Sequence, residues 1–311
     1  MKRVFIDGSA GTTGLRILER LAGRREIELI RLPEALRKDP SARRDALNAA
    51  DIAMLCLPDA AAVEAVNLVE NPDTAIIDTS TAHRTAPGWV YGFAELPGQR
   101  EHIAASKRIA NPGCHASGFI ALVAPLVRAG LLGSDALLCC TSLTGYSGGG
   151  KKMIAEYEAG DRSPLLDAPR QYGLGQQHKH LKEMAAVCGL DSAPAFMPVV
   201  ADFYSGMEVT VPLFASQLKG SIEDVRAVYR ACYAGPVVRF ADGPDEGGFL
   251  SAAALSGRDD MEIRVAGNDG RILLISRFDN LGKGASGAAI QNLNLLLGLE
   301  ETEGLVIGSH G

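Results

Sequence analysis

One cysteine, Cys114, stands where a thiol becomes a nucleophile. It lies in AsnProGlyCysHisAla at 111–116, after a short apolar strand pattern and before a long apolar helical stretch. A helix N-terminus stabilises a thiolate, and the thiolate is the form that attacks carbon. The pattern therefore predicts a nucleophile at Cys114. By contrast, Cys139 and Cys140 lie inside an apolar strand and are expected to pack in the core.

Two histidines and an acid form a second reactive group. GlnHisLysHisLeuLysGlu at 177–183 contains His178, His180 and Glu183. On a helix, residues three apart share a face, so Glu183 can orient His180, whereas residues two apart cannot point the same way. No further His or Cys cluster completes a metal site, and we predict acid/base work by one of the two histidines, with no metal. Which histidine acts stays open, and a surface histidine run is the alternative.

A glycine-rich turn follows the first predicted strand and opens the first predicted helix. Its sequence is GlySerAlaGlyThrThrGly at 8–14, with the spacing G-x-x-G-x-x-G. Backbone N–H groups and the helix dipole would face an anion there, which favours a pyrophosphate over a simple tight turn. The predicted contacts are Gly8, Ser9, Ala10, Gly11, Thr12, Thr13 and Gly14.

The end of the second predicted strand indicates which dinucleotide binds. Enzymes that use NAD usually place an acid there for the ribose hydroxyls, but this chain has Arg31, with Arg37 and Lys38 downstream. An arginine suits a 2'-phosphate, so NADP(H) is favoured over NAD(H). A solvated basic edge is the alternative interpretation.

A third segment resembles a triphosphate-binding loop. GlyTyrSerGlyGlyGlyLysLys at 145–152 matches G-x-x-x-x-G-K, but Lys152 stands where the motif requires Ser or Thr. An NTPase or kinase is therefore the weaker alternative, and we predict instead that Lys151 and Lys152 attract an anionic substrate. Arg84, which ends AspThrSerThrAlaHisArg at 78–84, carries a guanidinium suited to a carboxylate or phosphate.

The elements that position these residues indicate an α/β fold. Residues 1–116 alternate apolar strands with helical stretches, including Thr12 to Leu21, which predicts a Rossmann-like doubly wound dinucleotide-binding domain. The predicted strands are Arg3 to Ile6, Glu28 to Leu32, Ile52 to Leu57, Ala75 to Asp78 and Arg108 to Ala110.

Residues 117–284 change character and predict a mixed α/β catalytic and oligomerisation domain. After a helix from Ser117 to Ala129, strands alternate as half-buried strands do. GlyAsnAspGly at 267–270 predicts a hairpin, and SerIleGluAsp at 221–224 predicts a capping box. The C-terminal stretch 285–311, with a helix from 285 to 297, is expected to pack back on the first domain.

Composition excludes several classes. The chain has 311 residues, 47% of them hydrophobic, and a formal net charge of −6. The apolar content supports sizeable cores, and the negative charge argues against nucleic acid as a partner. No apolar run approaches the roughly 20 residues of a membrane span, the N-terminus lacks a secretory pattern, and the six cysteines show no C-x-x-C pairing. We expect a cytoplasmic protein with free thiols, most of them in the core.

Taken together, these motifs resemble the shorter form of the N-acetyl-gamma-glutamyl-phosphate reductase family. The resemblance covers nearly the whole chain. AsnProGlyCys, the HisLysHis segment and AspAsnLeuGlyLysGlyAlaSerGly at 279–287 are its specific part, and the chain lacks the proline of the longer members' H-x-H-x-P-E.

The resemblance implies a two-domain subunit similar to aspartate-semialdehyde dehydrogenase, NADP(H), and a homodimer or homotetramer. Its chemistry is the reversible reduction of an acyl phosphate through a thioester on Cys114, with phosphate released. Alternatives are another acyl-phosphate or semialdehyde dehydrogenase, or a non-enzymatic NADP(H) sensor. Further expected cofactor contacts are Leu57, Pro58, Ser80 and Asn280. Expected substrate contacts are Arg84, Asn111, Ser147, Lys151 and Lys152.

Overall fold

The structure, a computed structural model, describes residues 1–243 and 245–308, which form two compact units. The first unit consists of residues 1–94, 98–112 and 285–305, and the second of residues 95–97, 113–284 and the described part of 306–311. A parallel sheet with alternating helices and a separate mixed sheet confirm the predicted α/β class.

The unit boundaries differ from the predicted ones at three places, the first being residues 95–97, which belong to the second unit. The helix predicted from Ser117 begins at Cys114, and the whole helix belongs to the second unit because it packs on that unit's sheet. Residues 306–308 were expected to return to the first unit, but the Val306 backbone pairs with Asp259 of the second unit. The last predicted residues, 309–311, lie outside the described part of the chain.

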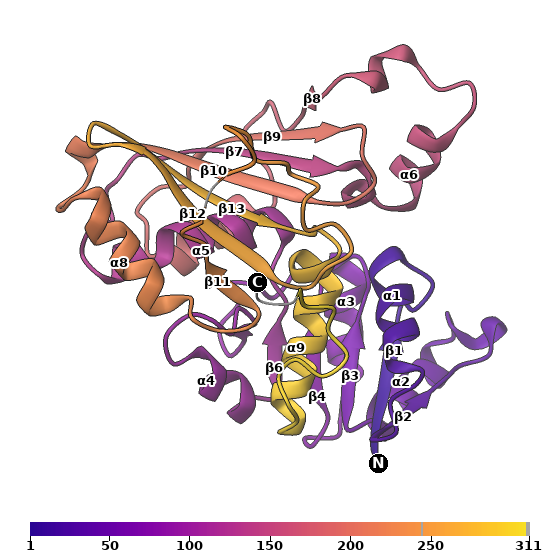
Figure 1. Ribbon diagram of the computed structural model, residues 1–311. Helices are drawn as coiled ribbons and strands as arrows, with labels where there is room; N and C mark the ends of the chain where they lie inside the picture. Colours follow the sequence, from indigo (N-terminus) through magenta and orange to yellow (C-terminus); the bar gives the residue numbers. More distant parts are fainter. Residues whose placement is uncertain (244, 309–311) are drawn as a thin grey trace. The chain divides into compact units, whose positions relative to one another are not determined.

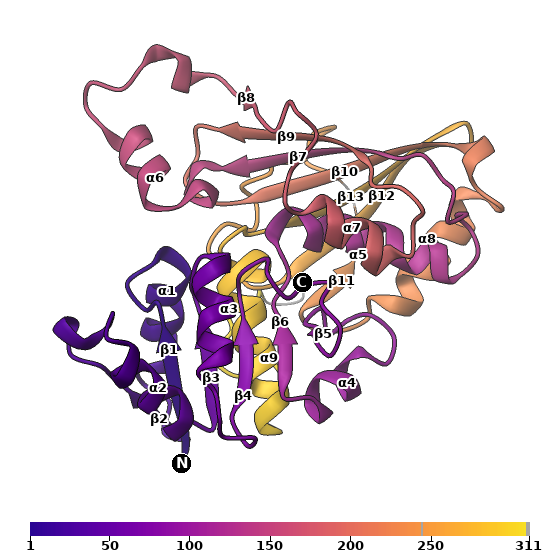
Figure 2. The ribbon, with the colours of Figure 1, turned by 180° about the vertical axis from the view of Figure 1, so that it is seen from behind.

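Six parallel strands build the sheet of the first unit, in the order β2-β1-β3-β4-β6-β5 (Figure 1; β5 is labelled in Figure 2). The order runs outward from β1 to β2 and then returns to β3 on the other side, as a doubly wound sheet does. The strands are β1 (Lys2–Asp7), β2 (Ile27–Ile30), β3 (Ile52–Leu55), β4 (Ala75–Asp78), β5 (Val90–Tyr91) and β6 (Arg108–Ala110).

Helices cover both faces of this sheet because its strands are apolar on both sides. Val4 and Ile6 of β1 lie in one core, which includes Ile290 of α9, whereas Phe5 between them lies in the other, with Leu47 of α2. Figures 1 and 2 show α9 and α3 on opposite faces. The helices are α1 (Thr12–Leu21), a 3-10 turn η1 (Glu34–Leu36), α2 (Pro40–Ala49), α3 (Asp59–Asn67), α4 (Gln99–Ala105) and α9 (Gly287–Leu297).

The second unit contains a seven-stranded mixed sheet, in the order β11-β12-β13-β10-β7-β9-β8. The pairs β11·β12 and β7·β9 are parallel and the others are antiparallel, which confirms the expected antiparallel character. The strands are β7 (Cys139–Gly145), β8 (Arg170–Gln171), β9 (Ala195–Ala201), β10 (Met207–Phe214), β11 (Val238–Phe240), β12 (Met261–Asn268) and β13 (Arg271–Phe278).

The helices α5 (Cys114–Arg128), α7 (Leu181–Cys188) and α8 (Ile222–Cys232) lie on one face of this sheet (Figure 2), where α5 packs on β10 and β13, and α8 packs on β11 and β12. The tightest contact is at Gly118, where an added Cβ would lie 2.4 Å from Val209 Cγ2 and 2.7 Å from Ser276 Oγ, so only glycine lets α5 approach the strands this closely.

Among the described helices, none is long and apolar enough to cross a membrane. The helices are α5 (Cys114–Arg128), α6 (Gly150–Glu158), α7 (Leu181–Cys188) and α8 (Ile222–Cys232), with short turns η2 (Tyr146–Gly149), η3 (Pro164–Asp167), η4 (Ala215–Gln217) and the π-helical η5 (Gly282–Ser286).

Both local predictions in this unit are confirmed. Asn268 pairs with Arg271 across a two-residue hairpin loop, and the Asn268 side chain accepts the N–H groups of Gly270 and Arg271. Ser221 caps α8 and exchanges hydrogen bonds with Asp224, as a capping box does.

The AspAsnLeuGlyLysGly segment at 279–284, after β13, is held by hydrogen bonds of Asp279 and by an ion pair of Lys283. Asp279 Oδ1 accepts the N–H groups of Leu281 (2.6 Å) and Gly282 (3.2 Å). Lys283 is buried and forms an ion pair with Glu95, with its Nζ 2.8 and 2.9 Å from the two carboxylate oxygens. A buried charge needs such a partner, so this pair stabilises the turn that leads toward α9.

Candidate active site

The turn after β1 requires glycine at two of its positions, Gly8 and Gly14. Gly8 has φ +86°, and a Cβ there would lie 2.2 Å from Cys56 O. A Cβ on Gly14 would lie 2.5 Å from Gly8 O. The Gly11 N–H donates to Gly8 O at 3.0 Å, which closes the turn. Two of the three glycines are therefore sterically required, beyond what a simple connection needs.

The first helix is open at its N-terminus. Gly11 is the N-cap of α1 and offers no side-chain hydrogen bond to the first helical turn. The backbone N–H groups at the start of a helix lack intrahelical partners, and the helix dipole makes this end positive. The turn is therefore able to hold a phosphate group, as its sequence predicts.

A cavity of about 560 Å³ opens beside this turn in the first unit. It is lined by Gly8, Ser9, Ala10, Arg31 and Leu57 of the predicted cofactor contacts. The other four glycine-turn residues, with Pro58, Ser80 and Asn280, are not among its lining residues, so their roles as cofactor contacts stay predictions.

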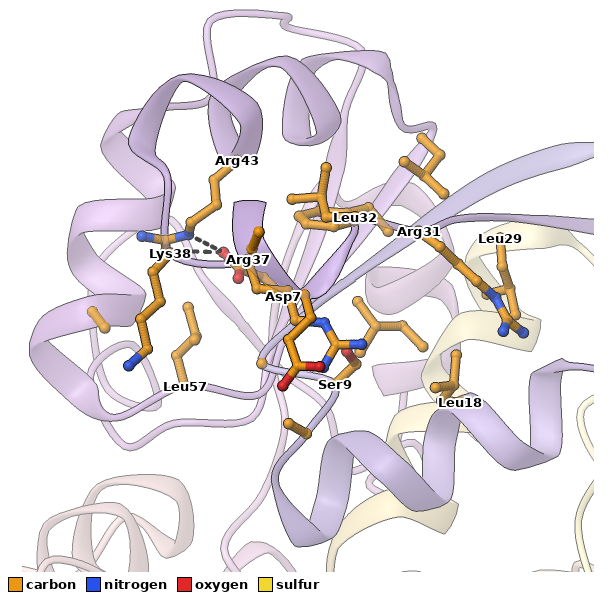
Figure 3. Close-up of a pocket in the computed structure, with 18 residues that line it drawn as sticks. Asp7, Ser9, Leu18, Leu29, Arg31, Leu32, Arg37, Lys38, Arg43 and Leu57 are labelled. Atoms are coloured by element: carbon orange, nitrogen blue, oxygen red, sulfur yellow. Dashed lines mark hydrogen bonds and ion pairs between the residues drawn. The ribbon is translucent and has the colours of Figure 1, made fainter.

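Four basic side chains belong to the cavity wall (Figure 3). Arg43 is buried and donates to Asp7 through Nε (3.1 Å) and Nη2 (2.9 Å), so the carboxylate at the end of β1 is already neutralised. Arg31 follows β2 by one residue, because the strand ends at Ile30 rather than at the predicted Leu32. Arg31, Arg37 and Lys38 are exposed and give this wall a positive charge.

The segment AspThrSerThrAlaHisArg at 78–84 forms a compact turn at the end of β4. Asp78 is buried and accepts hydrogen bonds from the Ser80 backbone N–H (2.9 Å) and hydroxyl (2.7 Å), and its other contact is the His83 Nδ1 at 2.6 Å. Arg84 donates to the carbonyl oxygens of Asn111 (2.9 Å) and Thr79 (3.1 Å). The hydroxyl of Ser80 and two nitrogens of Arg84 thus have local structural partners.

Asn111 also has internal partners in the first unit. It is buried, its Nδ2 donates to Ala285 O at 3.1 Å, and its Oδ1 accepts from Asn292 Nδ2 at 3.1 Å. The two hydrogen bonds connect the segment after β6 with the start of the last helix. The proposed contact of this side chain with substrate stays a prediction.

Cys114 is the first residue of α5, three residues before the predicted helix start, and it is partly exposed. Its N-cap, Gly113, provides no side-chain hydrogen bond, and a residue at a helix N-terminus lies in the positive field of the helix dipole, which favours a thiolate. A Cβ on Gly284 would lie 2.9 Å from Cys114 Cβ, and glycine therefore allows the segment after β13 to pass beside the thiol.

The histidine segment lies at the same helix start. Glu183 is buried, and its Oε2 accepts the Gly113 backbone N–H at 3.2 Å, while its Oε1 lies 4.0 Å from His180 Nε2. The ring centroids of His178 and His180 are 4.7 Å apart. This is possible because α7 begins only at Leu181, so the two histidines precede the helix and escape the two-apart restriction that a helix imposes.

This cluster is completed by three residues that sequence reasoning missed: His115, Ser142 and Tyr172. His115 is buried, with Nδ1 2.7 Å from Ser142 Oγ and Nε2 2.6 Å from Tyr172 Oη. Its ring centroid lies 5.4 Å from that of His178 and 5.6 Å from that of His180. Only the position of His115 directly after Cys114 was a signal in the sequence.

The other predicted substrate residues, Lys151, Lys152 and Ser147, lie on α6 and on the turn η2 before it, outside the histidine segment. Lys151 and Lys152 are exposed on α6. Ser147 is buried and accepts from Asn280 Nδ2 at 3.0 Å, and Asn280 Oδ1 accepts the Gly206 N–H at 2.9 Å. The side chains of Ser147 and Asn280 therefore stabilise each other in the second unit.

One cysteine prediction is wrong. Cys139 is exposed, because it opens β7 and points to the opposite side from its neighbour, whereas Cys140 is buried as expected. Burial raises the pKa of Cys140 and of Cys188 well above the usual value, and raises that of Cys56 to about 12. The expectation that most of the thiols lie in the core holds in part: Cys140 and Cys188 are buried and Cys56 packs against the core of the first unit, whereas Cys114 and Cys232 are half-buried.

Comparisons with known proteins identify the architecture. The model of the semialdehyde dehydrogenase NAD-binding domain matches residues 33–106, and that of the semialdehyde dehydrogenase dimerisation domain matches residues 114–280. Aspartate semialdehyde dehydrogenase from Francisella tularensis has a TM-score of 0.72 at 16% identity, covering 96% of this chain and 100% of that one. The enzyme from Candida albicans has a TM-score of 0.65 at 15% identity, covering 94% and 98%.

Curated relatives narrow the assignment. N-acetyl-gamma-glutamyl-phosphate reductase 2 of Nostoc sp. is 46% identical over 319 residues, which cover 97% of this chain and 99% of the relative. The reductase of Brucella ovis is 49% identical over 306 residues, covering 95% and 99%.

The two matched models and the shared fold place the chain in the semialdehyde dehydrogenase class. Within this class, identity of 46 to 49% over nearly the full length means that the chain belongs to the N-acetyl-gamma-glutamyl-phosphate reductase family. This membership decides against the NTPase interpretation of the loop at 145–152. Among the described residues, no group of three or more His, Cys, Asp or Glu side chains is arranged to hold a metal ion.

Proposed function

We propose that this protein catalyses the reversible, NADPH-dependent reductive dephosphorylation of N-acetyl-gamma-glutamyl phosphate to N-acetylglutamate 5-semialdehyde, a step of arginine biosynthesis. The observation that carries the proposal is the thiol of Cys114 at an open helix start, with Glu183 hydrogen-bonded to the preceding residue and His180 beside it. The relatives that share 46 to 49% of its residues carry the name of this reaction.

The first step forms a thioester. One of His178 and His180 accepts the Cys114 thiol proton, and the thiolate sulfur attacks the acyl carbon of the substrate. The C–S bond forms as the bond from carbon to the phosphate oxygen breaks, and phosphate leaves with that electron pair and takes up the proton held by the histidine. Glu183 stabilises the imidazolium while the proton is held there.

The second step reduces the thioester. When bound, NADPH would supply the hydride that reduces the acyl carbon. Backbone N–H groups at the start of α5 and the active histidine then donate hydrogen bonds to the oxyanion of the hemithioacetal. Collapse breaks the C–S bond, expels the Cys114 thiolate and releases the aldehyde.

The cavity of the first unit supports NADP(H) as the cofactor. The glycine turn fits a pyrophosphate, since Cβ atoms on Gly8 or Gly14 would fill the space that the turn needs. Arg31, Arg37 and Lys38 line the same cavity, and their charge suits a 2'-phosphate. The aspartate semialdehyde dehydrogenase of Candida albicans, which shares the fold, was crystallised with NADP.

The substrate's anionic groups need cationic partners in addition to the thiol. We propose the predicted residues Arg84, Asn111, Ser147, Lys151 and Lys152 for this role. Lys151 and Lys152 are the best suited, because they are exposed on α6, whereas the polar atoms of Asn111 and Ser147 already have internal partners. Arg84, whose guanidinium donates to the carbonyl oxygens of Asn111 and Thr79, is proposed for the same role because this group suits a carboxylate or phosphate.

We further propose a homodimer or homotetramer that forms through the second unit. Helices cover one face of its sheet, and Leu273 and Phe214 are exposed on its strands at 39% and 64%. The matched dimerisation-domain model supports a second copy as the occupant. The free thiols fit a reducing compartment, and we place the enzyme in the cytoplasm.

A substrate screen tests the function. Oxidation of N-acetylglutamate 5-semialdehyde should require both NADP⁺ and inorganic phosphate and should exceed the kcat/KM for aspartate semialdehyde and for glyceraldehyde 3-phosphate by at least about 100-fold. Comparable rates for aspartate semialdehyde would contradict the proposed substrate. Turnover that does not depend on phosphate would contradict the thioester route.

A further inference from the structure

The residue after the nucleophile connects two hydroxyl groups from distant parts of the second unit. His115 lies in the first turn of α5, Ser142 on β7, and Tyr172 directly after β8. The imidazole contacts Ser142 Oγ at 2.7 Å and Tyr172 Oη at 2.6 Å. The two-step mechanism uses none of these three side chains.

The imidazole in this chain is neutral. Burial, together with the positive charge that His178 can carry, lowers the His115 pKa to about 3. A neutral imidazole has one N–H donor and one acceptor nitrogen, so one of its two contacts is a donation and the other an acceptance.

Ser142 decides which nitrogen carries the proton. Its side chain is fully buried, and within the described residues the only hydrogen-bond partner of its Oγ is His115 Nδ1. A buried hydroxyl whose proton finds no acceptor is costly, so the Ser142 O–H must donate to Nδ1. The His115 proton is then on Nε2, and this N–H donates to the Tyr172 oxygen.

The Tyr172 hydroxyl proton is consequently directed away from His115. Burial raises the pKa of this phenol well above its usual value, and a charge on Cys114 raises it further, so the phenol retains its proton. The Tyr172 ring is only half-buried and lies 6.2 Å from the His178 ring. Among the described residues, no second partner accepts the Tyr172 proton.

We propose that Ser142 and His115 are positioning residues that fix the Tyr172 hydroxyl as a hydrogen-bond donor to an oxygen of the acyl group bound at Cys114. Tyr172 is then a further residue that touches the substrate. This inference rests on the proposed function, because it assigns a role in the same reaction. No proton is transferred along the chain; the three groups set only the direction of one O–H bond.

Removing the hydroxyl alone is the first test. The Tyr172→Phe variant should lose about 10- to 100-fold in kcat/KM for N-acetylglutamate 5-semialdehyde, because one donor to a developing oxyanion is lost, while its Kd for NADPH stays within about twofold. The matched control is Tyr233→Phe, which removes a buried phenol hydroxyl whose hydrogen bond, to Ala121 O, is also 2.6 Å long. This control should lose stability and keep its kcat/KM.

Variants of His115 separate positioning from packing. His115→Phe should lose as much kcat/KM as Tyr172→Phe, and the double variant should lose no more than either single variant, since both break the same contact. His115→Gln, whose amide can donate near the position of Nε2, should recover part of the loss. Additive losses, or no recovery in a folded His115→Gln variant, would overturn the positioning role.

A spectroscopic measurement does not depend on activity. The ¹⁵N spectrum of ring-labelled wild-type enzyme at pH 7 should show His115 as the neutral tautomer with its proton on Nε2, and a proton on Nδ1 would overturn the inference. An inactive wild-type enzyme would contradict the proposed function. An active wild-type enzyme with an equally active Tyr172→Phe variant would contradict only the role of Tyr172.

Discussion

Glu183 accepts a hydrogen bond from the backbone N–H of Gly113, the residue that precedes Cys114, although 70 positions separate the two. The contact joins the start of α7 to the start of α5, so the acid, the histidines and the thiol are held by two helix N-termini. A buried carboxylate at this position is stabilised by the helix dipole and the N–H group.

Glu183 should therefore contribute to both stability and rate. Glu183→Ala should lower the free energy of unfolding by about 1–3 kcal/mol, because the Gly113 N–H is left without this acceptor. Glu183→Gln retains an acceptor oxygen and should lose less than about 1 kcal/mol. Both variants remove the charge that supports an imidazolium and should lower kcat by at least about 10-fold. Urea unfolding and steady-state kinetics measure the two effects, and a fully active Glu183→Gln variant would refute the electrostatic role.

Cys114→Ser should abolish phosphate-dependent NADP⁺ reduction, with kcat lowered at least about 1,000-fold, because a serine hydroxyl is a far weaker nucleophile than a thiolate. NADPH binding should be unchanged in fluorescence titrations. Cys139→Ser, which replaces an exposed thiol on β7, is the control and should retain activity. Iodoacetamide should label Cys114 in the wild-type enzyme and spare Cys140 and Cys188, which are buried. Wild-type rates in Cys114→Ser would remove the thioester route.

Arg31→Ala should weaken NADPH binding about 10- to 100-fold and NADH binding by less than about threefold. The reason is that only NADPH carries the 2'-phosphate that the Arg31 guanidinium would contact. The control is Arg44→Ala on α2, which removes an arginine that does not line the cavity and should affect neither cofactor. Isothermal titration calorimetry with NADPH and with NADH measures the Kd of each nucleotide for both variants. An equal loss for NADPH and NADH would mean that Arg31 does not contact the 2'-phosphate.

His115 should make the folded state sensitive to acid. Its pKa is about 3 in the folded chain and about 6.5 when unfolded, so between these values the unfolded state binds more protons. Stability from this group is fully present above pH 6.5 and falls by up to about 1.4 kcal/mol per pH unit as the pH drops toward 3. Urea unfolding at pH 7.5 and pH 5 should show a larger loss for the wild type than for His115→Gln. Parallel losses would contradict the low pKa.

Local sequence signals were sufficient for several elements. The predicted strands at 75–78 and 108–110 and the helix at 12–21 have the observed bounds, because apolar periodicity and glycine boundaries act over a few residues. Other boundaries were less accurate: β2 ends at Ile30 and β3 at Leu55, where the chain leaves the sheet two residues earlier than its apolar run suggests.

The candidate site was predicted in part. The place of Cys114 at a helix start follows from the residues around it, and His180 and Glu183 meet as their spacing indicates. Ser142 and Tyr172 gave no signal, since a serine in a strand and a tyrosine in a loop have many uses. Cys139 was misassigned because an apolar strand pattern does not tell which face of the sheet a helix covers.

By itself, the sequence determined which backbone conformations are possible and which atoms are reactive: glycines where a Cβ would collide, a thiol at the start of a helix, and histidines able to hold a proton near neutral pH. Only the tertiary structure decided which of these groups meet. The Gly113–Glu183 and His115–Tyr172 contacts join residues 70 and 57 positions apart. Such contacts depend on how helices and strands pack on one sheet, and no local periodicity encodes that packing.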